Sequence, residues 1–182
     1  MLCIDIPEME LYMESEQRFV STRPVSLRLE HSLVSVSKWE MKWRKPFLVK
    51  DPPKTREETI DYIRCMTINQ NVDPLVYYAI TNKEMAEIQT YIDTQFTATT
   101  FDRSKNGSRA NRQIVTSELI YYWMVAYQIP FECQKWHLSR LMTLIEICNV
   151  KNQPSKKMSR QEILSQNKAL NAARRAKMNT KG

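Results

Sequence analysis

The sequence predicts a mainly α-helical protein with a small β element near its N-terminus. The chain of 182 residues has only two glycines, Gly107 and Gly182, so tight hairpins and glycine-rich loops are disfavoured. Most segments place apolar residues at helical spacing, and one segment alternates apolar and polar residues as a half-buried strand does. The scarcity of glycine also excludes the GxGxxG and Walker-type loops that cradle phosphates.

The β element is expected at the start of the chain. Residues 25–32, VSLRLEHS, carry apolar side chains at a period of two, which predicts a strand with one buried face. Residues 3–7, CIDIP, are a plausible partner strand that ends at Pro7. A two-stranded ribbon is marginally stable alone, so it should pack on helices or on a second copy.

Two helices in the first half of the chain are predicted from their caps. One should cover residues 32–44, with Ser32 as its cap and Pro46 beyond its end. The next should begin at Thr55, which is spaced for a capping box with Glu58. In such a box each side chain satisfies a backbone amide at the start of the helix.

Further helices are predicted along the rest of the body. Asp73 followed by Pro74 marks a third start, because proline suits the first helical position. Asn82 is expected to cap a fourth helix. Residues 116–128 are apolar on most faces, which predicts the central helix of the core. A last helix of the body is expected over residues 132–150.

Charge divides the chain near residue 150. The net charge is +7, yet residues 151–182 hold nine basic residues and one acid, whereas the first 150 residues carry a net charge of −1. We therefore expect a helical domain over residues 1–150 and a basic tail over residues 151–182. Ser159 and Glu162 are spaced for another capping box, which predicts a helix in the tail. This helix has few bulky apolar residues, so it should be frayed when free and ordered on a partner.

Candidate catalytic and metal-binding residues are few. Cys133 and His137 are four apart on a predicted helix, a spacing that two zinc ligands can have, but no second ligand pair is visible. The same pair lacks an orienting third group and oxyanion donors for nucleophilic catalysis. We therefore expect structural roles for both residues, no enzyme activity, no cofactor and no metal. Four widely spaced cysteines, without a signal peptide or a membrane-spanning segment, predict reduced thiols in the cytoplasm.

One basic stretch contains several aromatic residues. Trp39, Trp43 and Phe47 lie among lysines and arginines between residues 38 and 47. Interleaved rings and bases can stack on and neutralise single-stranded nucleic acid. The simpler alternative, which we prefer, is an amphipathic helix with core tryptophans and solvated lysines.

Partner binding is predicted in the basic tail. Its positive charges could contact phosphates or anionic lipid. It lacks the Trp, Phe or Leu-rich face that inserts into a membrane, and the chain has no recognisable DNA-reading motif. A helical protein partner fits the slim, alanine-rich end of the tail better. The residues expected to bind are Arg160, Lys168, Arg174, Arg175 and Lys177 for charge, Ile163, Leu164 and Leu170 as apolar anchors, and Trp39 and Trp43 in addition.

Four stretches together resemble a group of proteins from long-tailed bacteriophages that are labelled tail assembly chaperones. They cover nearly the whole chain: LEHSLVSVSKWEMKWRKPFL (29–48), KTREETIDYIRCMT (54–67), IVTSELIYYWMVAYQIPFECQKWHLSRLMTLIEICN (114–149) and KKMSRQEILSQNKALNAARRAKMNTKG (156–182).

The resemblance implies a non-enzymatic assembly factor in the host cytoplasm. Such chaperones are thought to coat the helical tape measure protein while tail-tube subunits polymerise around it, and then to leave. The partners implied are therefore the tape measure protein and the tail-tube protein, and no catalytic residues carry over.

Two alternatives stay open at this point. One is a nucleic-acid-binding phage protein that grips phosphates with its tail and with the basic stretch 102–112. The other is a structural component of the virion. Self-association is also open, because the acidic N-terminal end and the basic C-terminal end could attract each other within or between copies.

Overall fold

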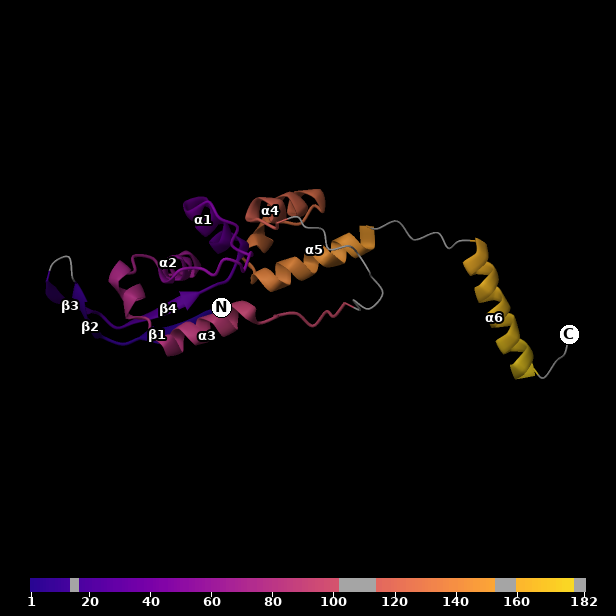
Figure 1. Ribbon diagram of the computed structural model, residues 1–182, viewed down its shortest axis with the longest axis horizontal. Coiled ribbons are helices and arrows are strands. Elements are labelled where there is room, and N and C mark those ends of the chain that lie inside the picture. The colour runs from indigo at the N-terminus through magenta and orange to yellow at the C-terminus, as the bar shows by residue number, and fades with distance from the viewer. Residues whose placement is uncertain (14–16, 102–113, 153–159, 179–182) are drawn as a thin grey trace. The chain divides into compact units, whose positions relative to one another are not determined.

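The computed structural model describes residues 1–13, 17–101, 114–152 and 160–178, and it confirms the mainly α-helical class with some β structure (Figure 1). Residues 1–148 form one compact unit, and residues 149–182 belong to a second. In chain order the elements are β1 (Leu2–Ile6), β2 (Met9–Met13), β3 (Arg18–Thr22), β4 (Val25–Leu29), α1 (Leu33–Trp43), α2 (Arg56–Met66), the 3-10 helix η1 (Pro74–Ala79), α3 (Asn82–Asp93), α4 (Ser117–Ala126), the 3-10 helix η3 (Phe131–Lys135), α5 (Leu138–Asn152) and α6 (Arg160–Met178).

The expected β ribbon is present and continues into a second pair of strands. β1 pairs antiparallel with β4, and β2 pairs antiparallel with β3. The two pairs of strands follow the same register. When the register is continued past the pair Ile6 and Val25, Pro7 lies opposite Pro24. Neither proline has an amide hydrogen, so the ladder of hydrogen bonds is interrupted there.

The ribbon changes its inward face at these prolines. On β1 the buried residues are Ile4 and Ile6, whereas on β2 it is Met9 and Leu11 that pack against the core. The alternation of a strand has a period of two, so the odd spacing between these two sets means that the opposite face turns inward. The sequence pattern did not predict β2 and β3.

The predicted caps of α1 and α2 are confirmed. The Ser32 side chain accepts a hydrogen bond from the backbone N–H of Ser35, at 3.3 Å. Thr55 and Glu58 form the expected capping box, because each side chain accepts from the backbone N–H of the other residue, at 3.2 and 2.8 Å. Both helices therefore begin where the sequence places them.

The next two predicted starts need correction in detail. Asp73 does cap a helix that begins at Pro74, accepting from the N–H of Leu75 at 2.9 Å, but the helix is the 3-10 helix η1. The cap of α3 is Thr81, and Asn82 is already its first helical residue. The Glu84 carboxylate fixes this start, because it accepts from the backbone N–H of Thr81 at 2.6 Å.

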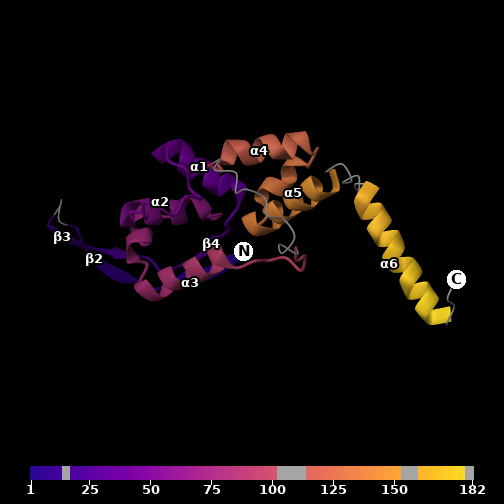
Figure 2. The same ribbon diagram turned by 45° about the vertical axis from the view of Figure 1, so that its right-hand side comes forward.

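The central helix of the first unit is α1, so the expectation for residues 116–128 is wrong. α1 contacts α2, α4 and η3, and α1 and α4 lie side by side in Figures 1 and 2. α4 buries Ile120 and Met124 toward this neighbour but exposes Tyr122 and Val125. A pattern that is apolar on most faces predicted the central helix, but several of these residues are tyrosine or tryptophan, which tolerate partial exposure to water because each carries a polar group.

The helix predicted over 132–150 is split in two. η3 ends at Lys135 and α5 begins at Leu138. The break is stabilised by the segment that follows β4, because the carbonyl of His31 accepts a hydrogen bond from the N–H of Leu138 at 2.7 Å. A bridge between Ser32 and His137 adds to it. These tertiary hydrogen bonds replace those of one continuous helix, and no sequence pattern encodes them.

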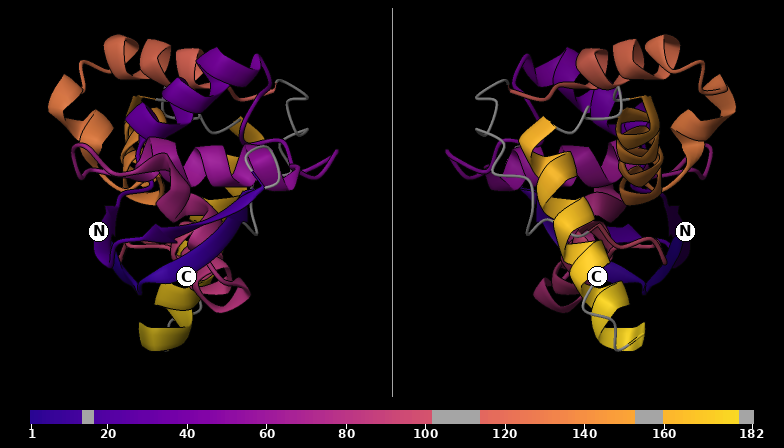
Figure 3. Two further views of the ribbon diagram at one scale, coloured as in Figure 1. Left: turned by 90° about the vertical axis from the view of Figure 1, so that its left-hand side faces the viewer. Right: turned by 90° about the vertical axis from the view of Figure 1, so that its right-hand side faces the viewer.

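The core of the first unit is assembled from the ribbon and all the surrounding helices. Seen from the end, α1 and α4 lie at one side of the stack, α2 and α5 lie in the middle, and the ribbon and α3 lie at the other side (Figure 3). The largest fully buried side chains are Ile6, Leu27, Leu29, Leu33, Val36, Trp39, Ile63, Met66, Ile88, Ile120, Met124 and Leu141.

The second unit contains helix α6. The predicted capping box of Ser159 and Glu162 is not testable, because Ser159 lies outside the described residues and the Glu162 side chain is not described. The basic stretch 102–112 lies outside the described residues as well.

Candidate partner-binding surfaces

All the binding residues predicted in the tail lie on α6. Its apolar anchors are exposed by 45% at Ile163, 61% at Leu164 and 49% at Leu170. Its basic residues are exposed too: Arg160, Lys168, Arg174, Arg175 and Lys177. Together they form what we call the α6 surface.

The two sides of α6 differ in composition. At 3.6 residues per turn, Ile163, Leu170 and Arg174 share one side of the helix. The other anchors and bases flank them on the same half. The opposite side carries small side chains: Ser165, Ala169, Ala172, Ala173 and Ala176. Bulky and charged groups are therefore concentrated on one half of the helix.

The charges of α6 are unpaired within the described part of the chain. None of its lysines or arginines forms an ion pair there. Exposed, unpaired cations next to apolar side chains suit a surface that binds an acidic partner.

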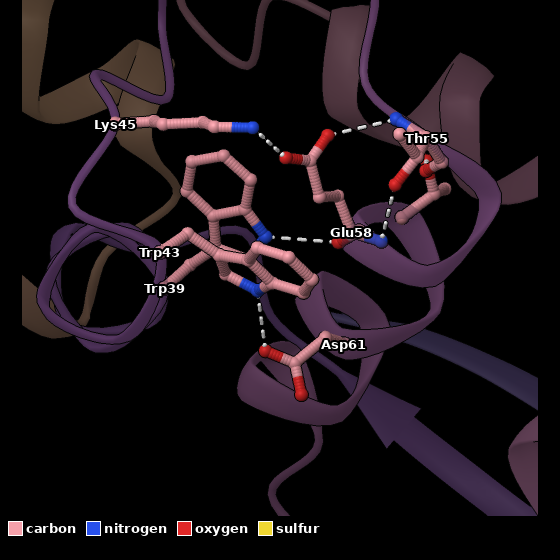
Figure 4. A network of polar contacts seen from close by, with 7 residues as sticks. Trp39, Trp43, Lys45, Thr55, Glu58 and Asp61 are labelled. Atoms are coloured by element: carbon pink, nitrogen blue, oxygen red, sulfur yellow. Dashed lines mark hydrogen bonds and ion pairs between the residues drawn. The ribbon is translucent and has the colours of Figure 1, made fainter.

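The second set of predicted binding residues occupies a different setting. Trp39 is 1% exposed, and its indole N–H donates to the carbonyl of Glu58 at 2.8 Å. Trp43 is half-buried and stacks on Trp39, with 6.2 Å between ring centroids. Its indole N–H donates to the Asp61 carboxylate at 2.9 Å (Figure 4). Trp39 is therefore a core residue, as the preferred alternative predicted, and it has almost no exposed surface for a partner.

Two lysines near these tryptophans pair with acids of α2. Lys45 pairs with the buried Glu58 at 2.5 Å, and Lys42 pairs with the buried Asp61. The hydrogen bond from Lys45, helped by the capping bond from Thr55, lowers the pKa of Glu58. The basic and aromatic stretch is therefore balanced by α2 and belongs to the packing of α1 on α2.

Glu40, a third buried acid, joins α1 to α4. One carboxylate oxygen accepts from the N–H of Phe47 at 2.8 Å, and the other accepts from the N–H of Ser117 at 2.7 Å. Ser117 is the first residue of α4, where free backbone amides favour a negative charge. The hydrogen bonds of Glu40 thus fix where α4 begins, although Glu40 and Ser117 are far apart in the sequence.

Cys133 and His137 are not brought together on one helix as their spacing predicted. Cys133 lies in η3, and His137 lies in the break before α5. Both ring nitrogens of His137 have partners, the Ser139 hydroxyl at 2.8 Å and the Tyr91 carbonyl at 3.3 Å. Among the described residues, no group of three or more His, Cys, Asp or Glu is placed to hold a metal ion.

His31 is packed beside His137 in the core. The ring centroids of the two histidines are 5.1 Å apart, and Nδ1 of His31 is hydrogen-bonded to the Tyr62 hydroxyl. Burial, together with the nearby His137, lowers the pKa of His31 to about 3. Burial also raises the pKa of Tyr62. His31 and Tyr62 therefore form a neutral, hydrogen-bonded part of the core.

Two further surfaces were missed by the sequence analysis. The ribbon exposes an aromatic pair, Tyr12 and Phe19, which face each other across β2 and β3 with 5.1 Å between ring centroids. A groove beside α5 contains Trp136 and Arg140. Neither could be found from local periodicity, because each depends on segments that meet only in the fold.

Comparison with known proteins adds no family. No family model matches the chain, and neither a curated protein nor a solved structure matches it. In the part of the chain that the structure describes, no helix is long and apolar enough to cross a bilayer.

Proposed function

We propose that this protein is a non-enzymatic assembly factor of a long-tailed bacteriophage that acts in the host cytoplasm. It would bind the tape measure protein, the tail-tube protein or both while the tail is built. The sequence resemblance supports this proposal. One structural observation carries the binding step: α6 presents, on the same half of one helix, bulky apolar side chains and basic side chains that have no ion pair with any described residue.

The composition of the α6 surface suits reversible binding to another helix. Ile163 and Leu170 are seven residues apart, so they meet a partner helix on one line. The basic side chains around them would pair with acids of the partner at the rim of the contact. Such contacts are individually modest and weaken with salt, as a factor that binds and then leaves requires.

A weak helix suits this role as well. A helix of this length with few apolar contacts is marginal in water, so part of the binding energy would go into ordering it. That cost lowers the affinity and speeds release. A chaperone that coats a long helical protein gains from many weak sites rather than one tight one.

The test is a co-expression pull-down with the candidate tape measure and tail-tube proteins. One variant replaces Ile163, Leu164 and Leu170 by serine, and a second replaces Arg174 and Arg175 by glutamine. A matched control replaces Ala169 and Ala172, on the opposite side of the same helix, by serine. We expect both surface variants to lose the tape measure protein and the control to retain it.

The other outcomes also discriminate between functions. Equal retention by all the variants would exclude the α6 surface as the binding site. Recovery of nucleic acid alone, released by nuclease or by high salt, would favour the nucleic-acid-binding alternative. Stoichiometric amounts of the protein in purified particles would favour a structural role in the virion.

A further inference from the structure

A groove of about 450 Å³ lies in the first unit between the extended segment 96–99 and helix α5. α5 contributes apolar side chains, including Leu144 and Ile147. Hydroxyl groups from both walls also line the groove. Among the described residues, Arg140 is its one charged lining residue, and no acid lines it. A site with this lining combines apolar contact, hydrogen-bonding capacity and a single positive charge.

The extended wall is held in place without being paired as a strand. The backbone N–H of Phe96 donates to the Ser139 hydroxyl at 3.2 Å, and the Phe96 ring packs on His137 with 4.7 Å between centroids. In contrast, the main chain of Thr97 and Ala98 makes no hydrogen bond to any residue that the structure describes. Within the part of the chain that the structure describes, this wall therefore has unpaired main-chain donors and acceptors.

The charge at the groove is positioned and uncompensated. The Arg140 guanidinium lies over the Trp136 ring, 4.8 Å from its centroid. Among the described residues it has no ion pair. Stacking restricts the guanidinium plane and leaves its N–H edge free to bind a carboxylate with two hydrogen bonds.

We propose that this groove binds an extended segment of a partner protein that carries one aspartate or glutamate. The partner's main chain pairs with Thr97 and Ala98, as in strand addition, and its carboxylate binds Arg140. Its apolar side chains pack on α5 beside Leu144. A nucleic acid fits less well, because it presents a phosphate at every nucleotide to a groove whose described lining residues carry a single positive charge.

This groove lies in a different unit from the α6 surface and recognises a different shape. It binds an extended strand, whereas α6 is proposed to bind a helix. The inference therefore does not rest on the proposed function, and each can fail without the other.

The test is a selection from a displayed library of short random peptides, carried out on the full-length protein at physiological salt. Affinities of the enriched peptides are then measured on the wild type, on Arg140→Gln and on Ala98→Pro. The matched control is Arg23→Gln, which removes an exposed arginine far along the chain from the groove. Circular dichroism melting checks that each variant is folded.

We expect the enriched peptides to share one acidic residue at a fixed position. Arg140→Gln should weaken them by at least about tenfold, as expected for the loss of a charge-assisted hydrogen bond. Ala98→Pro should weaken them too, because proline removes a backbone donor. Arg23→Gln should leave binding unchanged.

Three results would overturn the inference. One is enrichment of no peptide, or of peptides without a shared acid. Another is binding that is equally sensitive to Arg140→Gln and Arg23→Gln, which indicates general charge attraction, for example to α6. The third is a folded Ala98→Pro variant with wild-type affinity, which excludes main-chain pairing.

Discussion

Helices α1 and α6 have similar local sequences and different surroundings. Both combine bulky apolar residues with basic residues, lysines in α1 and lysines and arginines in α6, and both were expected to contribute binding residues. In α1, Trp39 is buried, Trp43 donates to Asp61, and Lys42 pairs with the same carboxylate. In α6, the apolar anchors are exposed, and its cations have no ion pairs among the described residues.

The difference arises from the neighbouring sequence. α2 supplies Glu58 and Asp61, which pair with Lys45 and Lys42, so two of the positive charges in and beside α1 already have acidic partners. The tail has a single acid, Glu162, among its nine basic residues. A basic and aromatic pattern therefore does not by itself identify a binding surface. The presence of acids on an adjacent helix distinguishes a packed face from an open one.

The largest expected effect on stability comes from a substitution in the packed face of α1. Trp39→Ala should lower the free energy of unfolding by about 3–5 kcal/mol, because it leaves a cavity in a fully packed core. It also removes the hydrogen bond to the Glu58 carbonyl. Urea unfolding followed by circular dichroism measures the change. A loss below about 1 kcal/mol would contradict the core role of Trp39.

A second prediction concerns the protonation of His31, the residue before the cap of α1. The pKa of His31 is about 3 in the folded protein, against about 6.5 in an unfolded chain. Between these values the unfolded chain binds a proton that the folded protein does not, so the free energy of unfolding decreases as the pH falls below about 6.5. The expected loss is about 2 kcal/mol at about pH 5.

Chemical unfolding at several pH values measures this loss. His31→Gln should show a smaller change between about pH 8 and pH 5, because glutamine does not titrate there. Part of the slope should remain, since burial also lowers the pKa of His137. An unchanged slope in the variant would assign the pH dependence to other groups.

Local sequence patterns predicted the starts of α1 and α2 but not the contacts between elements. The cap at Ser32 and the capping box at Thr55 depend on residues within one helical turn, so they are visible in the sequence. The split between η3 and α5 depends on the carbonyl of His31, which is distant in the chain. The paired strands β2 and β3 were missed because the prolines change the inward face of the ribbon.

The candidate surfaces show the same division. The bulky and basic half of α6 follows from helical periodicity alone, so it was predictable. The burial of Trp39 depends on packing against α2, and the groove beside α5 depends on segment 96–99. The amphipathic pattern of residues 32–44 already favoured core tryptophans, but the partner of Trp39 on α2 and the groove beside α5 are not properties of one helix, so spacing could not predict them.

A third prediction tests the charge balance between α1 and α2. Asp61→Asn should lower the free energy of unfolding by about 1.5 kcal/mol, since it removes the ionic partner of Lys42 and weakens the acceptor for Trp43. The loss stays moderate because the Lys42 side chain is 56% exposed, so water can solvate its charge. Glu87→Gln, at an exposed position of α3, is the control and should be neutral in the same urea titration.

The smallest expected effect on stability belongs to α6, and there the comparison with α1 is sharpest. Leu170→Ala should change the free energy of unfolding by no more than about 0.5 kcal/mol, because the leucine is already half exposed. Binding of the tape measure protein should nevertheless weaken, by an amount that calorimetry at two salt concentrations can measure. Arg174→Gln should weaken it more at low salt than at high salt, since exposed charges are screened. A residue that contributes to binding and little to folding defines an open surface. If Leu170→Ala instead cost as much stability as a core substitution, α6 would be a packed helix like α1, and its apolar residues would not be available to a partner.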